Sequence, residues 1–435
     1  MGLNLKHVPM KKNIVIVVLL LLTLQLSAQN ENDILQKDRY YYNDFYREYP
    51  VSEISNTEKP PKGYKAIYIS HLGRHGSRYH TELQLYSNLL NFLEEASKCG
   101  ELTDIGQKLL LDWREICQQS LERGGDLTMQ GIAEHEGIAQ RMFHSYPTIF
   151  NKNSRIVCKS TLSPRCIMSM GVFSKKLQSL QPRATIEMEA SPRNQYLKSV
   201  SGLNAAKGSS IPLSDSIRHK MVSPIALSVI ERIVSPSGQM IKSIKDPAQF
   251  AFDIFLGVAN SPHEKRGEND LAKYLFTAEQ RSTLAMASNV RRYILSGPNK
   301  EFLDFVLLGI IPLVKNVIMD AQDALSNGKC QANLRFGHDV TIIAFTKILG
   351  IREASFETND YTSLGLRWLC SRVSPMASNA QLIFYKNKKG DILVKVLFCE
   401  REQELDNGLQ AIDRYYYKWN DFKQFLLDKI NRYEH

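Results

Sequence analysis

The pattern of hydrophobic and polar positions begins with a stretch in which short strands alternate with helices. Apolar residues repeat either every second position, as in a strand, or every three to four positions, as in a helix. Thr128 suits a helix N-cap, and Pro164 suits the first turn of a helix that runs to about residue 180. The predicted strands are residues 65–70, 154–160 and 185–190, and the predicted helices are residues 82–96 and 101–119 and those that start at Thr128 and Pro164.

The next stretch, residues 195–325, is dominated by helical periodicity and shows no strand alternation. We therefore expect an all-helical insertion or cap. Its predicted helices are residues 247–258, 278–295 and 301–325, and its predicted Gly/Ser/Pro loops are residues 201–213, 234–238 and 259–269.

Strand character returns at residues 331–336, followed by a helix to residue 349. Residues 380–385 and 392–398 flank a Gly-containing turn typical of a hairpin, and residues 409–433 predict an amphipathic helix. Strands alternating with helices on both sides of a helical block predict an α/β fold, with a Rossmann-like sheet flanked by helices and interrupted by the cap. The predicted boundaries are 63–195 and 326–435 for the two parts of this domain and 196–325 for the cap.

The first 28 residues predict a secretory signal peptide. Lys6, Lys11 and Lys12 precede an apolar run over residues 14–22, and the small residue Ala28 ends the segment. The alternative is a retained membrane anchor, which needs an apolar span of about 20 residues. We expect an exported protein, periplasmic, secreted or on the outer surface, without stable membrane insertion once the leader is removed. Residues 29–62 are expected to form an irregular lead-in on the surface of the main domain.

Composition adds a preference for anionic ligands. The chain has 435 residues and a formal net charge of +10, and removing the three leader lysines leaves +7. Basic residues are scattered, without a long basic run or interleaved aromatic residues, which argues against nucleic-acid binding. The seven cysteines contain no Cys-x-x-Cys spacing, and their odd number leaves at least one thiol unpaired.

The candidate chemistry begins in the loop after the first predicted strand, where Arg74 and Arg78 flank His75. Open α/β sheets place ligands at such strand ends. Guanidinium groups bind phosphate oxygens bidentately and keep their charge. Two neighbouring cations also disfavour protonation of His75, which leaves a neutral nitrogen able to attack phosphorus. Taken alone, the loop is equally compatible with an exposed basic turn.

Two later strand-to-helix junctions supply complementary groups. Arg165 opens a helix, so its side chain and the helix N-terminal amides can face an anion. At the second junction, His338 is predicted to bind the phosphate and Asp339 to act as a general acid. Read singly, Arg165 also fits a surface position and Asp339 fits simple helix capping. Convergence of the three strand ends would join these groups with the first loop in one phosphate pocket.

These motifs resemble the histidine acid phosphatase family, in its phytase-containing branch. The resemblance covers about residues 62–405. It implies a phosphohistidine on His75, phosphate binding by Arg74, Arg78, Arg165 and His338, proton donation by Asp339, and no metal or other cofactor. The motifs that carry it are Arg74-His75-Gly76-Ser77-Arg78, residues 160–165, His338-Asp339, residues 125–131 continuing to Glu134-His135, and residues 375–379 and 394–400.

Within the family, Tyr79 and Thr81 resemble the multiple inositol polyphosphate phosphatases, with two departures. His80 stands where a proline is usual, and the donor motif is His338-Asp339 where those phosphatases typically carry His-Ala-Glu. Aspartate is shorter than glutamate by one methylene, so the donor must lie closer or the substrate must sit deeper.

The expected function is an exported phosphomonoesterase acting on a phosphorylated small molecule, with inositol phosphates such as phytate as suspected substrates. Candidate contacts for further phosphates in the cap are Lys207, Arg218, Lys220 and Arg266, although each also fits a solvated charged surface. The alternatives are a broad-specificity acid phosphatase and a non-catalytic phosphate-binding protein. The sequence does not indicate the oligomeric state or the pairing of the cysteines.

Overall fold

The computed structural model describes residues 41–433 apart from residues 56, 199, 265–270 and 407. The predicted leader and the first part of the lead-in lie outside the described residues. None of the helices in the described ranges combines the length and the apolar character that a bilayer crossing requires. All seven cysteines are free thiols, and five of them are buried.

One mixed sheet of eight strands forms the centre of the molecule, in the order β3-β2-β4-β1-β5-β6-β7, with β8 paired to β6. The pairs β3-β2, β2-β4 and β4-β1 are parallel. β5 pairs antiparallel with β1 and with β6. The strands predicted from the sequence, including the hairpin, are confirmed. The bounds are β1 Lys65–Arg74, β2 Arg155–Ser160, β3 Thr185–Ala190, β4 Ala332–Gly337, β5 Asn379–Lys386, β6 Ile392–Phe398, β7 Arg401–Glu402 and β8 Tyr416–Lys418.

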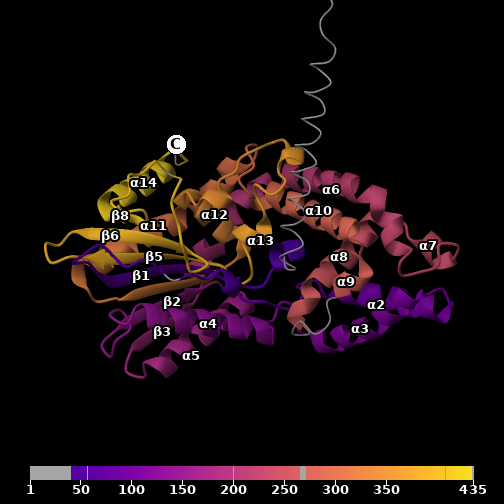
Figure 1. The fold of residues 1–435 in the computed structure, drawn as a ribbon, viewed down its shortest axis with the longest axis horizontal. Coiled ribbons are helices and arrows are strands. Elements are labelled where there is room, and N and C mark those ends of the chain that lie inside the picture. The colour runs from indigo at the N-terminus through magenta and orange to yellow at the C-terminus, as the bar shows by residue number, and fades with distance from the viewer. Residues whose placement is uncertain (1–40, 56, 199, 265–270, 407, 434–435) are drawn as a thin grey trace, which may run out of the picture.

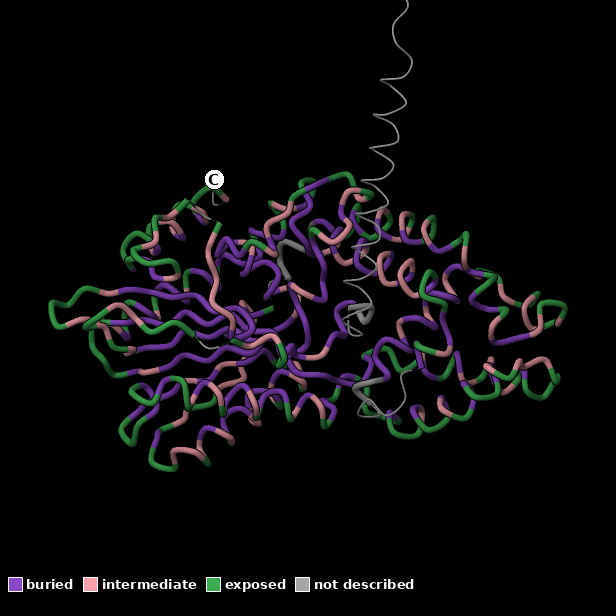
Figure 2. Tube along the Cα trace, in the orientation of Figure 1, coloured by how far each residue is buried: buried purple, intermediate pink, exposed green. Residues whose placement is uncertain are grey.

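Helices cover both faces of the sheet, so the predicted Rossmann-like α/β architecture is confirmed (Figure 1). Figure 2 shows the strands as a buried band between helices whose outer sides are exposed. Thr128 caps α4 by accepting a hydrogen bond from the Gly131 amide, and Pro164 starts α5. One face carries α4 (Met129–Ser145) and α5 (Pro164–Leu180), and the other carries α11 (Leu303–Asn327), α12 (Asp339–Leu349) and α14 (Trp419–Asn431).

A second hydrophobic core joins the helices beside the sheet (Figure 1). The two cores draw on residues from both sides of the predicted cap boundaries. α2 and α3 precede the predicted insertion yet pack in the helical core, whereas α11 lies within the insertion yet packs in the core of the sheet. The helices of this part are α2 (Leu83–Lys98), α3 (Asp104–Ser120), α6 (Val200–Ile230), α7 (Gln239–Ser243), α8 (Pro247–Glu264), α9 (Leu271–Leu275) and α10 (Ala278–Ser296).

Short helical segments complete the described chain. A four-residue helix, α13 (Cys370–Val373), lies between α12 and β5. The 3-10 segments are η1 (Tyr41–Tyr46), η2 (Val51–Glu53), η3 (Pro192–Lys198), η4 (Arg352–Ala354) and η5 (Tyr361–Ser363).

Three local predictions are wrong. Residues 201–213, predicted as a loop, belong to α6, which packs against α8, α10 and α11. Residues 259–264 of another predicted loop continue α8. Tertiary packing of this kind overrides weak helix propensity. Residues 409–418 are not helical, because Tyr416 and Tyr417 bury their rings in β8, a strand that pairs with β6.

Residues 44–50 of the lead-in are mostly buried, contrary to the prediction of a surface segment, whereas the described residues of 51–62 are exposed or half-buried, as predicted. Asp44, Phe45, Tyr46 and Arg47 are buried, and η1 contacts α8, α10 and α13. Aromatic rings bury large apolar areas, which explains why this segment packs inward.

Two histidines are buried among the aromatic rings between β1 and α4. His71 and His135 each pack against Phe173 and Phe336. Neither ring nitrogen of His135 has a hydrogen-bond partner among the described residues. Burial lowers the pKa of each histidine to about 3, so both are neutral near pH 7.

The neutrality of the buried His135 predicts that the free energy of unfolding decreases as the pH falls. Below the unfolded pKa of 6.5, the unfolded chain binds a proton at His135 that the folded chain rejects, so stability falls with pH. The variant His135→Leu is expected to lose less unfolding free energy than the wild type between pH 7 and pH 5, by up to about 1.4 kcal/mol per pH unit below 6.5. Denaturant unfolding at both pH values measures this. Equal losses would contradict it, and the exposed His144, replaced by leucine, is the control.

Candidate active site

Three strand ends meet at one edge of the sheet. β2, β4 and β1 are parallel neighbours, with Ser160 opposite Phe336 and Arg74 opposite Gly337. The loop after β1 is tied to the end of β4, because the His75 amide donates to the Gly337 carbonyl over 3.1 Å. The loops that follow these strands therefore bring all six predicted site residues into one neighbourhood.

His75 is buried and presents one ring nitrogen with a lone pair. Its Nδ1 lies 2.9 Å from the Gly76 carbonyl, which can only accept, so Nδ1 carries the proton and Nε2 does not. Burial lowers the pKa of His75 well below its ordinary value, and the nearby arginines, Arg74 first, lower it further. The imidazole is therefore neutral, as a nucleophile requires.

Arg74 and Arg78 extend from the same loop and are held by backbone carbonyls. Arg74 is completely buried, and its Nη1 donates to the Phe45 carbonyl over 2.7 Å and to the Ser374 carbonyl. Arg78 Nη1 donates to the Tyr79 carbonyl over 3.0 Å. These bonds orient both guanidinium groups without neutralising their charge.

Arg165 and His338 form a pair at the other two loops. Arg165 Nη2 donates to His338 Nδ1 over 3.4 Å, so the proton of His338 sits on Nε2, which lies 3.2 Å from Thr161 Oγ1. Burial, followed by Arg165, lowers the pKa of His338 to about 4. Both nitrogens thus have protein partners, and His338 orients Arg165. The phosphate contact predicted for His338 stays a prediction.

The three arginines share one feature. The Nε atoms of Arg74, Arg78 and Arg165 are buried and have no hydrogen-bond partner among the described residues. Leaving a buried cationic donor unpaired is costly, and guanidinium groups pair bidentately with phosphate oxygens. The arrangement therefore suits an anion with several oxygens.

Asp339, at the start of α12, is paired with an arginine that the sequence reasoning missed. Its Oδ2 lies 3.2 Å from Arg292 Nη1, and its Oδ1 accepts from the Val340 amide over 2.9 Å. Burial alone would raise the pKa of Asp339, but Arg292 and Arg74 outweigh it and hold the pKa below its usual value. Asp339 is ionised in the ligand-free site. Arg292 sits inside the regular pattern of α10, so no motif marks it.

The lead-in supplies a wall of the site that the sequence reasoning also missed. The Phe45 ring lies under two guanidinium groups, with Arg292 at 4.2 Å and Arg74 at 5.9 Å from its centroid. Tyr46 packs against Arg78 at 5.7 Å in the same way. Such cation–π contacts stabilise a buried cation without removing its charge. The run of aromatic residues at 40–46 is the only sequence signal for this wall.

The motif at residues 125–135 anchors the His75 loop from α4. The Glu134 carboxylate accepts hydrogen bonds from the Ser77 amide over 2.8 Å and from the Ser77 hydroxyl over 2.9 Å. Burial raises the pKa of Glu134 to about 7. Gly76 and Gly131 allow the loop and the helix to touch, because a Cβ on Gly131 would lie 2.1 Å from the Ser77 carbonyl oxygen.

His80, at the position where proline is usual, is buried and lines the cavity. Its backbone amide donates to the Tyr86 hydroxyl over 2.7 Å, and its Nδ1 accepts from the Glu82 amide over 3.1 Å. A proline has no amide to donate, so this loop is fixed by bonds that proline could not make in full.

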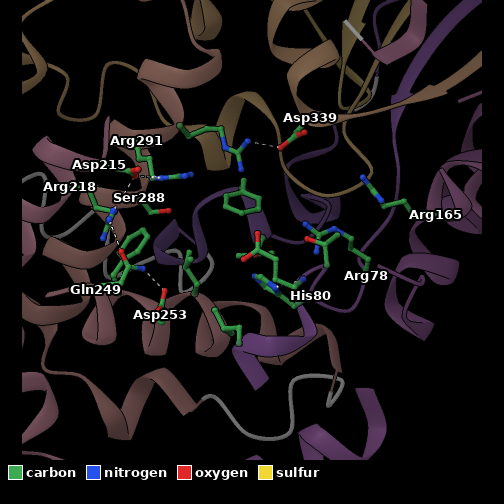
Figure 3. A pocket seen from close by; sticks show the side chains of 18 of the residues that line it. Arg78, His80, Arg165, Asp215, Arg218, Gln249, Asp253, Ser288, Arg291 and Asp339 are labelled. Atoms are coloured by element: carbon green, nitrogen blue, oxygen red, sulfur yellow. Dashed lines mark hydrogen bonds and ion pairs between the residues drawn. The ribbon is translucent and has the colours of Figure 1, made fainter. Parts of the chain in front are cut away.

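A cavity of about 350 Å³ connects the loops with the helical part (Figure 3). His75, Arg78, Arg165 and Asp339 line it, whereas Arg74 and His338 lie behind its wall. Of the basic cap residues suggested by the sequence, Arg218 lines the cavity. Lys207 and Lys220 are exposed and are not among its described lining residues, and Arg266 lies outside the described residues.

The solved structures that match this fold include phosphatases. A multiple inositol polyphosphate phosphatase of Bifidobacterium longum in complex with inositol hexasulfate matches with a TM-score of 0.76 and 17% identity, over 89% of this chain and 97% of that chain. A phytase from D. castellii matches with a TM-score of 0.69 and 13% identity, over 90% and 85%. No protein-family model and no curated protein matches the sequence. The histidine acid phosphatase fold expected from the motifs is confirmed.

The close contact between the His75 loop and α4 predicts that no side chain larger than that of glycine is tolerated at Gly131 without loss of stability. Gly131→Ala is expected to lose about 1–3 kcal/mol of stability through overpacking against Ser77. Gly171 on α5 is the matched control, because an added Cβ there meets nothing within 4 Å. Gly171→Ala should be neutral or gain up to about 1 kcal/mol. Denaturant unfolding measures both, and equal effects would contradict this account.

The aromatic wall predicts a contribution of Phe45 to anion binding. Phe45→Leu keeps an apolar side chain but removes the ring that faces Arg292 and Arg74. We expect inorganic phosphate to bind more weakly, by up to about 30-fold, the equivalent of about 2 kcal/mol. Isothermal titration calorimetry with phosphate measures this. Phe45→Tyr retains a ring and is the control, and equal affinities for the two variants would contradict the role of the ring.

Proposed function

We propose that this chain is a phosphomonoesterase that works through a phosphohistidine. The observation that carries the proposal is the neutral, buried His75, which lines the cavity with an unprotonated Nε2, together with the arginine Nε donors that have no partner among the described residues. The match in fold to phosphatases supports it.

In the first step, His75 Nε2 attacks phosphorus in line with the ester oxygen. A P–N bond forms, the P–O ester bond breaks, and the leaving oxygen takes a proton. Arg78 and Arg165, which line the cavity, stabilise the charge that spreads over the phosphoryl oxygens, and the buried charge of Arg74 adds to this from behind the wall. In the second step, water attacks phosphorus, the P–N bond breaks, and inorganic phosphate leaves with His75 neutral again.

Asp339 is the proposed proton carrier in both steps. Because Arg292 keeps it ionised in the ligand-free site, the proton has to arrive from solvent or with a singly charged phosphate ester. A bound phosphate competes for Arg292 and Arg74 and so raises the pKa of Asp339. In the second step Asp339 accepts the proton of the attacking water.

Inositol phosphates, phytate among them, are the proposed substrates, since the Bifidobacterium longum relative in fold is named for them. We also propose that the predicted leader exports the protein, which N-terminal sequencing of the mature chain tests. A broad-specificity acid phosphatase is the second candidate, because the described cavity lining carries acidic as well as basic side chains.

The nucleophile is tested with His75→Ala. We expect turnover of p-nitrophenyl phosphate to be abolished, and wild-type protein quenched rapidly into base to carry phosphate on His75. His144→Ala, at an exposed position of α4, is the control and should retain activity. Turnover by His75→Ala would refute the assignment. A wild-type protein that binds phosphate but turns nothing over would instead be a non-catalytic binding protein.

The proton carrier is tested by the pH dependence of kcat, which reports the groups of the enzyme–substrate complex. We expect an acidic optimum, with kcat falling as pH rises because Asp339 in that complex loses the proton that it donates. Arg292→Gln removes the cation that lowers the pKa of Asp339, so the falling limb should move to higher pH. A flat profile in the wild type, or a limb that does not move in the variant, would contradict the role of Asp339.

A further inference from the structure

The cavity has an outer half that the proposed chemistry does not use. Figure 3 shows two groups of side chains, with Arg78, Arg165 and Asp339 on one side and a second group on the helices of the cap. The second group comes from α6, α8 and α10 and comprises Asp215, Arg218, Gln249, Asp253, Ser288 and Arg291.

These outer side chains form one chain of alternating donors and acceptors. Asp215 Oδ1 lies 3.3 Å from Arg291 Nε and 3.7 Å from Arg218 Nε. Arg218 Nη2 donates to Gln249 Oε1 over 2.7 Å, and Gln249 Nε2 donates to Asp253 Oδ1 over 2.7 Å. Both outer arginines are thus already paired with a carboxylate, in contrast to the arginines around His75.

The charges of the lining residues determine how many negative charges a bound ligand can carry. Among its described lining residues, arginines exceed carboxylates by only one. In the outer group, Asp215 and Asp253 equal Arg218 and Arg291 in number, so no net positive charge is left there. The arginines are Arg78, Arg165, Arg218, Arg291 and Arg292, and the carboxylates are Glu82, Asp215, Asp253 and Asp339.

This balance disfavours a polyphosphorylated leaving group. Each phosphate carries up to about two negative charges near pH 7, and placing several beside Asp215 and Asp253 brings like charges together. A hydroxyl group both donates and accepts, so it fits a wall where carboxylate, guanidinium and amide alternate. Arg218 Nη1 is buried without a partner among the described residues and offers one such donor. Apolar contact is available from Phe252, whose ring lies 4.8 Å from the Arg218 guanidinium.

We infer that the outer half binds the hydroxyl groups of a polyhydroxylated leaving group, a sugar or a cyclitol, so that the substrate is a phosphate monoester with few phosphates. This inference rests on the proposed phosphatase function and departs from it in one respect, because it makes an ester with few phosphates, and not phytate, the preferred substrate. Asp215 and Asp253 accept hydrogen bonds from the hydroxyls, and Arg218 donates one.

The inference is tested by comparing kcat/KM for four esters, namely glucose 6-phosphate, myo-inositol monophosphate, myo-inositol hexakisphosphate and p-nitrophenyl phosphate. We expect at least one of the two ring monophosphates to exceed the hexakisphosphate by about tenfold or more, the equivalent of about 1.4 kcal/mol. Equal values, or a preference for the hexakisphosphate, would overturn the inference.

Asp253→Asn keeps the shape of the side chain and removes its charge. The ratio of kcat/KM for hexakisphosphate over monophosphate should rise by up to about fivefold in this variant, as expected for one unfavourable charge contact. Asp304→Asn removes a charge from an exposed residue at the start of α11, outside the described cavity lining. It should leave the ratio as in the wild type. A ratio that responds equally to both substitutions, or to neither, contradicts a local effect of Asp253.

The two proposals fail in different ways. If p-nitrophenyl phosphate is turned over but the hexakisphosphate is the preferred ester, the phosphatase proposal stands and the inference about the outer half is wrong. If none of the four esters is turned over, both are wrong.

Discussion

The site depends on a single buried cation, the Arg74 guanidinium. It is completely enclosed, and among the described residues it is held by the carbonyls of Phe45 and Ser374 and by no carboxylate. Its charge is therefore available to its surroundings. It helps to keep His75 neutral and Asp339 ionised, two opposite protonation states that a single positive charge favours at once.

Around this cation, charge is stabilised more by rings and backbone carbonyls than by ion pairs. Phe45 and Tyr46 face three guanidinium groups, and Tyr79 contributes a carbonyl. In the outer half of the cavity, by contrast, ion pairs stabilise the cations, because Asp215 pairs with both Arg218 and Arg291. One cavity thus holds an end where Arg78 and Arg165 have no carboxylate partner among the described residues and an end where both arginines pair with Asp215.

Much of this arrangement was predictable, since it follows from local pattern. Arg74, Arg165 and His338 each lie where a strand passes into a polar loop. Because β1, β2 and β4 pair in parallel, these strand ends meet at the same edge of the sheet. Arg292 and Phe45 were not predictable, because they reach the site through packing between distant segments and carry no motif. The same limit explains α6, where packing between helices made a Gly/Ser/Pro stretch helical.

The two carbonyls that hold Arg74 also connect the site to the order of synthesis. Phe45 lies 29 residues before Arg74, and Ser374 lies 300 residues after it. A nascent chain that has completed β1 and α4 has the His75 loop but lacks the second carbonyl and all of β4. The guanidinium reaches its final position only when nearly the whole chain is present. The complete site is therefore a property of the finished molecule, and a shortened chain would keep the Arg74-His75 motif without all the contacts that hold it in place.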